Sequence, residues 1–418
     1  MKAKESLRGA HWIMCLLGIT LAIPSHAETS WPQFHGPLRD NMSRETGLLK
    51  EWPAGGPKLL WRFSGCGKGY ATVSIAEGLA FTSGDFGDEE YVLAVDLNGK
   101  FKWKTLNGKA WKGPQAGSRT TPTYSDGMVY QLNAYGVLSA FEAATGKPVW
   151  SVNVAERFDS RVRNWGYAEN LAIEDNLLLC TPGGSKGRVV ALDKKTGTTI
   201  WANTEIQDFA AYGSPVIVSH GGARMFINFL HETVAGVEVR TGKLLWSHPH
   251  ASTCDQNVTS PLYLDGNVFV TSGHRGGGRR FKLDAATGKT EELWFDKNFD
   301  NCHGGVIYVD GHLYFCGCRL YNKGLICVDF ATGQKCYRAE EIGKVSVTYA
   351  DGHLYCFGND GEMMLVKISP QAAQIVSRFT IPRNDNVHTL AHPVICDGKL
   401  YLRHLDDLLV YDIRAGDR

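Results

Sequence analysis

The segments LSAFEAATGKPVW (Leu138–Trp150) and VVALDKKTGTTIW (Val189–Trp201) decide the fold of this chain. In each, a strand with alternating apolar residues runs into an acidic residue, a Thr-Gly turn and a second strand that ends in Trp. The acidic residue starts the turn and Gly takes the positive-φ position that side chains with a Cβ resist. Each segment therefore predicts a β-hairpin.

Six further copies of this hairpin recur at intervals of roughly 45 residues, a period that indicates a modular fold. They are LAVDLNGKFKW (Leu93–Trp103), VAGVEVRTGKLLW (Val234–Trp246), FKLDAATGKTEELW (Phe281–Trp294), LICVDFATGQKCY (Leu325–Tyr337), a degraded copy at 367–379, and LLVYDIRAG, which ends at Gly416.

A second tight turn of polar residues with Gly or Asn precedes each copy, as in Asp126-Gly127 and Asp310-Gly311. Two hairpins per period make four strands, which is one propeller blade. The sequence therefore predicts an all-β fold, an eight-bladed β-propeller of four-stranded antiparallel blades. The last copy lacks an outer strand, whereas KLLWRF (Lys58–Phe63) is an outer strand without a hairpin. We expect this N-terminal strand to complete the last blade and close the ring.

Six of the 11 Trp residues occupy equivalent outer-strand positions: Trp61, Trp103, Trp150, Trp201, Trp246 and Trp294. We interpret them as structural wedges between blades, each with a satisfied indole N–H.

The repeats resemble the Trp-docking motif of the pyrroloquinoline-quinone (PQQ)-like propeller family. That superfamily includes quinoprotein alcohol dehydrogenases and the lipoprotein scaffold of the outer-membrane β-barrel assembly machine. The segments WPQFHGPLRDNMS (Trp31–Ser43) and NWGYAEN (Asn164–Asn170) are similar to a subgroup of secreted bacterial PQQ-like propellers. For the dehydrogenases, the resemblance implies PQQ with calcium, a pair of adjacent cysteines and a catalytic Asp. This chain contains no Cys-Cys pair.

The first 27 residues have the features of a secretory signal: a basic start, an apolar stretch from Ile13 to Ile23, and a small-x-small site at Ser25-His26-Ala27. We expect an exported protein, periplasmic or secreted, with an N-terminal extension at 28–57 and the propeller at 58–418. The apolar stretch is too short to span a bilayer.

The chain carries 44 basic and 43 acidic residues, so it lacks the global charge expected for nucleic-acid binding. We expect no nucleic-acid partner, no membrane span and a monomer. Ten of the 11 cysteines lie beyond the signal. One interpretation is that many of them are small buried strand residues. The other is that they form one or two disulfide bonds, because an exported protein meets oxidising conditions.

The longer connections of the predicted propeller link one blade to the next, and function tends to reside on such loops. Their final residues would face the mouth of the central funnel. The predicted ligand-binding residues are Arg119, Trp165, Tyr167, Tyr212, Asn257, His303, Lys344 and His392. Cationic side chains favour an anionic or polyhydroxylated ligand, and Trp165 offers a stacking face. The alternative is that these residues bond to one another and order the loops.

A metal site is a further hypothesis, with imidazole ligands from different blades: His231, His274, His303, His392 and His404. No Gly-x-Ser-x-Gly elbow, HExxH or dinucleotide-binding fingerprint occurs. The primary prediction is therefore a non-catalytic exported propeller that binds a protein, a glycan or a small ligand through its loop face and funnel. The alternatives are a PQQ-dependent dehydrogenase that uses calcium, and a hydrolase or lyase with a bound metal.

Overall fold

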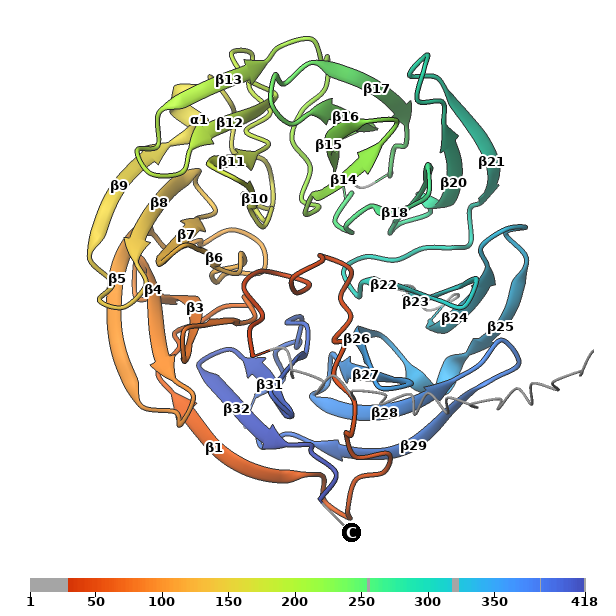
Figure 1. Ribbon diagram of the computed structural model, residues 1–418. Helices are drawn as coiled ribbons and strands as arrows, with labels where there is room; N and C mark the ends of the chain where they lie inside the picture. The colour runs from red at the N-terminus through yellow and green to blue at the C-terminus, as the bar shows by residue number, and fades with distance from the viewer. Residues whose placement is uncertain (1–28, 254–255, 318–322, 384, 417–418) are drawn as a thin grey trace, which may run out of the picture.

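The computed structural model describes residues 29–253, 256–317, 323–383 and 385–416. The predicted signal at 1–27 lies outside this range, as do Cys254 and Cys318. The described chain forms eight four-stranded antiparallel sheets arranged as a ring (Figure 1). The predicted eight-bladed propeller is confirmed.

The first four blades each consist of four consecutive strands, with the first strand innermost. They are β2 (Ser74–Ala76), β3 (Leu79–Phe86), β4 (Glu89–Asp96) and β5 (Phe101–Lys109); β6 (Thr123–Ser125), β7 (Met128–Leu132), β8 (Val137–Glu142) and β9 (Pro148–Asn153); β10 (Ala172–Glu174), β11 (Leu177–Cys180), β12 (Val189–Asp193) and β13 (Thr199–Asn203); and β14 (Val216–His220), β15 (Ala223–Phe229), β16 (Thr233–Glu238) and β17 (Leu244–Pro249).

The remaining blades repeat this order, and the last one borrows its outer strand from the N-terminal part of the chain. They are β18 (Leu262–Leu264), β19 (Asn267–Ser272), β20 (Gly277–Leu283) and β21 (Thr290–Asp296); β22 (Val306–Val309), β23 (His312–Gly317), β24 (Gly324–Asp329) and β25 (Lys335–Ala339); β26 (Val345–Ala350), β27 (His353–Gly358), β28 (Glu362–Ile368) and β29 (Ala373–Thr380); and β30 (Val394–Cys396), β31 (Lys399–His404), β32 (Asp407–Asp412) and β1 (Lys58–Ser64). Two short helices interrupt the connections, α1 (Val154–Arg157) and η1 (Glu340–Ile342).

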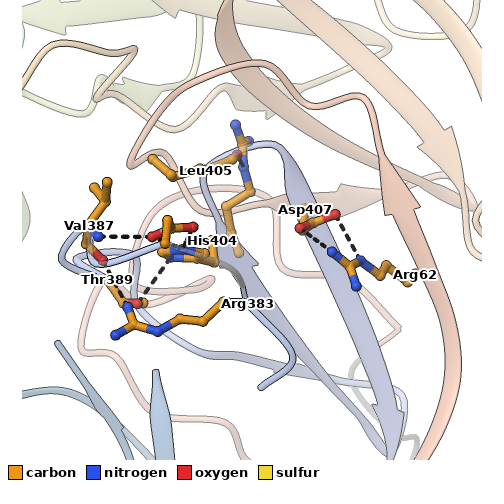
Figure 2. A network of polar contacts seen from close by, with 9 residues as sticks. Arg62, Arg383, Val387, Thr389, His404, Leu405 and Asp407 are labelled. Atoms are coloured by element: carbon orange, nitrogen blue, oxygen red, sulfur yellow. Dashed lines mark hydrogen bonds and ion pairs between the residues drawn. The ribbon is translucent and has the colours of Figure 1, made fainter. Parts of the chain in front are cut away.

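The ring closes where β1 pairs antiparallel with β32, with Phe63 opposite Leu408. Arg62 and Asp407 add an ion pair of 2.6 Å across this seam (Figure 2). Because the pair is partly solvated, it contributes little to stability, and the closure depends on the main-chain ladder. The predicted joining of the two ends is confirmed. Among the described residues, no helix has the length and apolar character needed to cross a bilayer.

The Trp residues dock each blade onto the next. Five of the six indole N–H groups donate to a carbonyl of the following blade at 2.9–3.0 Å: Trp61 to Leu97, Trp103 to Ala143, Trp150 to Lys194, Trp201 to Val239 and Trp294 to Phe330. Trp246 differs, because its Nε1 has no hydrogen-bond partner and its ring lies against Gly236 of its own blade. The prediction that every docking indole N–H is satisfied is therefore wrong for Trp246.

Several of the cysteines are free thiols buried inside the blades. Cys180 in β11 and Cys356 in β27 are buried among apolar neighbours, and burial raises the pKa of the Cys66 thiol to about 11. These three free thiols fit the interpretation as small buried residues.

Residues 29–57 form a segment that we call the strap. Figure 1 shows it crossing the centre of the ring before it enters β1. Trp31 exchanges two backbone hydrogen bonds with Ile75 in β2, at 2.8 and 2.7 Å. In the blade on the other side of the last blade, Ser43 donates to the Tyr349 carbonyl of β26 at 2.8 Å. The strap therefore ties together the inner strands of the two blades that flank the last blade.

The docking of Trp150 predicts a stability effect at Gly197 in the next blade. Gly197 has φ +70°, and a Cβ there would lie 2.6 Å from Cε3 of Trp150. We expect Gly197→Ala to lower the free energy of unfolding by about 2–4 kcal/mol, from backbone strain together with the displaced ring. Gly127→Ala is the matched control, because Gly127 has φ +77° with nothing within 4 Å of the added Cβ.

Urea unfolding of both variants separates the two contributions. Gly127→Ala should lower the free energy of unfolding only by the strain of placing Ala at a positive φ, about 1 kcal/mol. Equal losses in the two variants would show that the Trp150 contact is not what constrains Gly197.

Candidate functional site

A cavity of about 360 Å³ occupies the funnel where the inter-blade connections meet the strap. We call it the funnel pocket. Six of the eight predicted ligand-binding residues line it: Arg119, Trp165, Tyr212, His303, Lys344 and His392. The structure therefore brings together side chains from six different inter-blade connections. Tyr70 and His388 add to the same wall.

The other two predicted residues, Tyr167 and Asn257, lie outside the funnel pocket. The Tyr167 hydroxyl donates to the Pro182 carbonyl at 2.9 Å. The Asn257 amide donates to the carbonyls of Leu230 and His250, at 2.9 and 3.0 Å. Both side chains are buried, so they order the loops that carry the pocket. Their expected place at the funnel mouth is wrong, because backbone carbonyls of neighbouring loops capture their polar groups.

Arg119 lines the pocket, but its guanidinium is already engaged. It donates to the carbonyls of Trp165 and Gln115, and its carbon lies 5.2 Å from the ring centroid of Trp111. Burial lowers the pKa of Arg119 to about 10, which leaves it charged at neutral pH. Arg119 thus holds two loops together and contributes positive potential rather than a free ion-pairing group.

Lys344 is the cation that remains available. It precedes β26 and lines the pocket, and its ammonium has no ion pair or hydrogen bond to another part of the described chain. Among the described residues, the pocket lining contains no Asp or Glu. Both formal charges at the pocket are therefore positive, which favours an anionic ligand.

The strap supplies part of the pocket floor, through Phe34. Phe34 stacks on His35 with ring centroids 3.8 Å apart, and His35 Nε2 lies 3.3 Å from Nδ1 of His392. His392 Nε2 donates to the His303 carbonyl at 2.6 Å, so Nδ1 is the acceptor that faces His35 and Asn41. Burial lowers the pKa of His392 to about 4 and keeps the imidazole neutral. The floor is a pre-formed set of neutral, mutually bonded rings.

The five histidines of the metal hypothesis do not form one ligand set, although His274, His303 and His392 all line the funnel pocket. Within the described ranges, no group of three His, Cys, Asp or Glu side chains is placed to hold a metal ion. His404 instead bonds to Asp385 at 2.9 Å and to Thr389 at 3.1 Å (Figure 2). His231 lies 3.3 Å from a guanidinium nitrogen of Arg163. The predicted convergence of all five imidazoles on one metal is wrong for the described part of the chain, because loop contacts hold His231 and His404 elsewhere.

Sequence reasoning missed Phe34 entirely. Its segment precedes the first strand by more than twenty residues, and no repeat signal marks it as part of the funnel. Sequence reasoning also missed two buried acids behind Arg119. Burial raises the pKa of Asp85 to about 6 and that of Glu90 to about 8.

The model of the family described as outer membrane protein assembly factor BamB matches residues 88–339. The chain belongs to this family of PQQ-like β-propellers.

Curated relatives match over shorter segments. The chain is 26% identical over 186 residues to the dehydrogenase subunit of alcohol dehydrogenase (quinone) from Acetobacter aceti, which covers 38% of the chain and 24% of that protein. It is 32% identical over 151 residues to quinoprotein ethanol dehydrogenase from Pseudomonas aeruginosa, covering 32% of the chain and 23% of the relative. The matches thus span about a quarter of the length of these relatives.

Solved structures show the same propeller at low identity. BamB from Moraxella catarrhalis superposes with a TM-score of 0.60 at 13% identity, covering 85% of this chain and 99% of that one. A europium-containing methanol dehydrogenase superposes with a TM-score of 0.65 at 12% identity, covering 90% and 89%. These likenesses establish the fold of this PQQ-like propeller and leave its activity open.

Glu90 predicts a pH dependence of stability. It is 1% exposed and accepts from Asn107 and Gln131 at 3.2 and 3.3 Å. Because its folded pKa of about 8 lies above the unfolded value, its stabilising contribution is present below the unfolded pKa and is lost as pH rises through about 8. We expect Glu90→Gln to reduce the fall in stability between pH 5 and 9, roughly the window set by these two pKa values.

The measurement is the urea midpoint at several pH values. Glu291→Gln, at an exposed position on β21, is the control and should leave the profile of the parent protein unchanged. If the Glu90→Gln profile keeps the full slope of the parent, Glu90 is not buried as described.

Proposed function

We propose that this chain is an exported, non-catalytic propeller that holds a small anionic ligand in its funnel pocket. The observation that carries the proposal is a pocket whose described lining contains no carboxylate and includes an unengaged ammonium, that of Lys344. The signal-like features of residues 1–27 support export.

The shape and composition of the pocket also support a small ligand. Aromatic side chains of Phe34, Trp165 and Tyr212 contribute to the lining, and a few polar groups converge between them. Concave sites of this size and composition suit a small molecule with an apolar body and one charged end. The body would lie against the aromatic rings while Lys344 binds the anionic group.

PQQ-dependent oxidation is the second candidate, because several relatives carry quinoprotein names. Calcium in proteins is bound by oxygen ligands, with carboxylates prominent among them. The described residues of the funnel lining include no Asp or Glu, so they do not fit a calcium-loaded quinone.

Lys344→Ala tests the proposed site with 4-hydroxybenzoate as the probe and 4-hydroxybenzamide as its neutral counterpart. We expect the parent protein to prefer the carboxylate, and Lys344→Ala to weaken its binding about tenfold or more at low salt, while the amide is unaffected. Calorimetric titration gives both affinities. Lys289→Ala, at an exposed turn residue, is the matched control.

Two results would contradict the proposal. One is equal affinity for the carboxylate and the amide in the parent protein. The other is a stoichiometric quinone chromophore that survives gel filtration after titration with PQQ and Ca²⁺, together with dye-linked alcohol oxidation. The second result would favour the dehydrogenase.

A further inference from the structure

A second concavity lies beside the funnel pocket, on the rim of the third and fourth blades. It has a volume of about 460 Å³. We call it the rim groove and define it by Arg161, Arg163, Asn164, Ser185, Arg188 and Phe209. All of these residues lie in loops between strands.

The rim groove is strongly cationic. Arg188 donates to the Gly183 carbonyl at 2.6 Å, which holds its side chain in place. Arg161 is exposed and has no ion pair with another residue of the described chain. Among the described residues of the groove lining, Asp159 has the only carboxylate, and it accepts a hydrogen bond from the Ser185 hydroxyl at 2.6 Å. Three guanidinium groups therefore face one carboxylate that is already bonded.

An aromatic ring stands among these arginines. The side chain of Phe209 is 52% exposed. The guanidinium carbons of Arg188 and Arg163 lie 5.1 and 5.6 Å from its ring centroid. The arginines thus fix the ring in an exposed position, where it presents an apolar platform between cations.

The rim groove and the funnel pocket are adjacent. A small cavity of about 10 Å³ shares Arg161 and Ala210 with the groove and Tyr212 with the funnel pocket. Asn164 of the groove is followed directly by Trp165 of the pocket. One inter-blade loop therefore carries residues of both sites, and an extended ligand that lies over this loop would contact both.

We propose that the rim groove is a second subsite for an acidic oligosaccharide whose first sugar unit occupies the funnel pocket; this assignment rests on the proposed function. Repeated carboxylates suit the guanidinium groups. The apolar face of a sugar ring packs on Phe209, and the Asn164 amide binds its hydroxyls. A bound peptide commonly adds to a strand edge, and no strand lines this groove.

The test compares galacturonate with tetragalacturonate by calorimetry at low salt, with maltotetraose as the neutral control. We expect the tetramer to bind about tenfold or more tightly than the monomer, and maltotetraose to bind weakly. The double variant Arg161→Ala/Phe209→Ala should reduce tetramer affinity to the monomer level without changing monomer affinity. Arg161→Lys with Phe209 intact should keep part of the higher affinity for the tetramer. Unchanged melting temperatures of the variants would exclude misfolding.

Lys344→Ala separates this proposal from the one on which it rests. It should weaken monomer and tetramer alike. If the monomer fails to bind while the tetramer still depends on Arg161, the funnel assignment fails and the rim groove stands. A tetramer that binds no better than the monomer, or a gain that survives the double variant, would overturn the rim subsite. Equal binding of a tetraglutamate peptide would overturn the saccharide assignment.

Discussion

The antiparallel pairing of β1 with β32 is the constraint on which the rest of the structure depends. Blades pack only on their neighbours, so an open ring would leave two sheet faces and two strand edges exposed. The pairing joins residues more than 340 positions apart, Phe63 with Leu408. Its main-chain hydrogen bonds hold the ring shut, and only then do the connections of all eight blades converge on one funnel.

The strap depends on the same closure. It can bond to β2 through Trp31 and to β26 through Ser43 only when the completed last blade holds those two blades on either side of it. The strap also closes one end of the central channel, because its Phe34 forms part of the floor of the funnel pocket. Phe34, His35 and His392 form a packed and neutral set at that floor, because burial disfavours the charged imidazole. Charge is thereby confined to the walls, where Arg119 and Lys344 lie.

Proteins with different described roles share this propeller fold. The family description names an assembly factor, whereas the curated matches name quinoproteins. A propeller permits this because blade packing is carried by strands and Trp docking, whereas the pocket is carried by connections of variable length. In this chain the connections supply cations and aromatic rings, and the acids Asp85 and Glu90 remain buried behind Arg119.

The eight blades, their four strands and the closure were all readable from the sequence. The signals that specify them are local: a hairpin turn, an alternating strand and a Trp such as Trp150 in each repeat. The sequence also identified six pocket residues, because repeat position places them at the funnel. Tertiary structure alone decided which polar groups stay available. Asn257 and Tyr167 are captured by backbone carbonyls, whereas Lys344 is not. It alone placed Phe34 in the floor and Arg161 beside Phe209, because these contacts join segments that no local pattern relates.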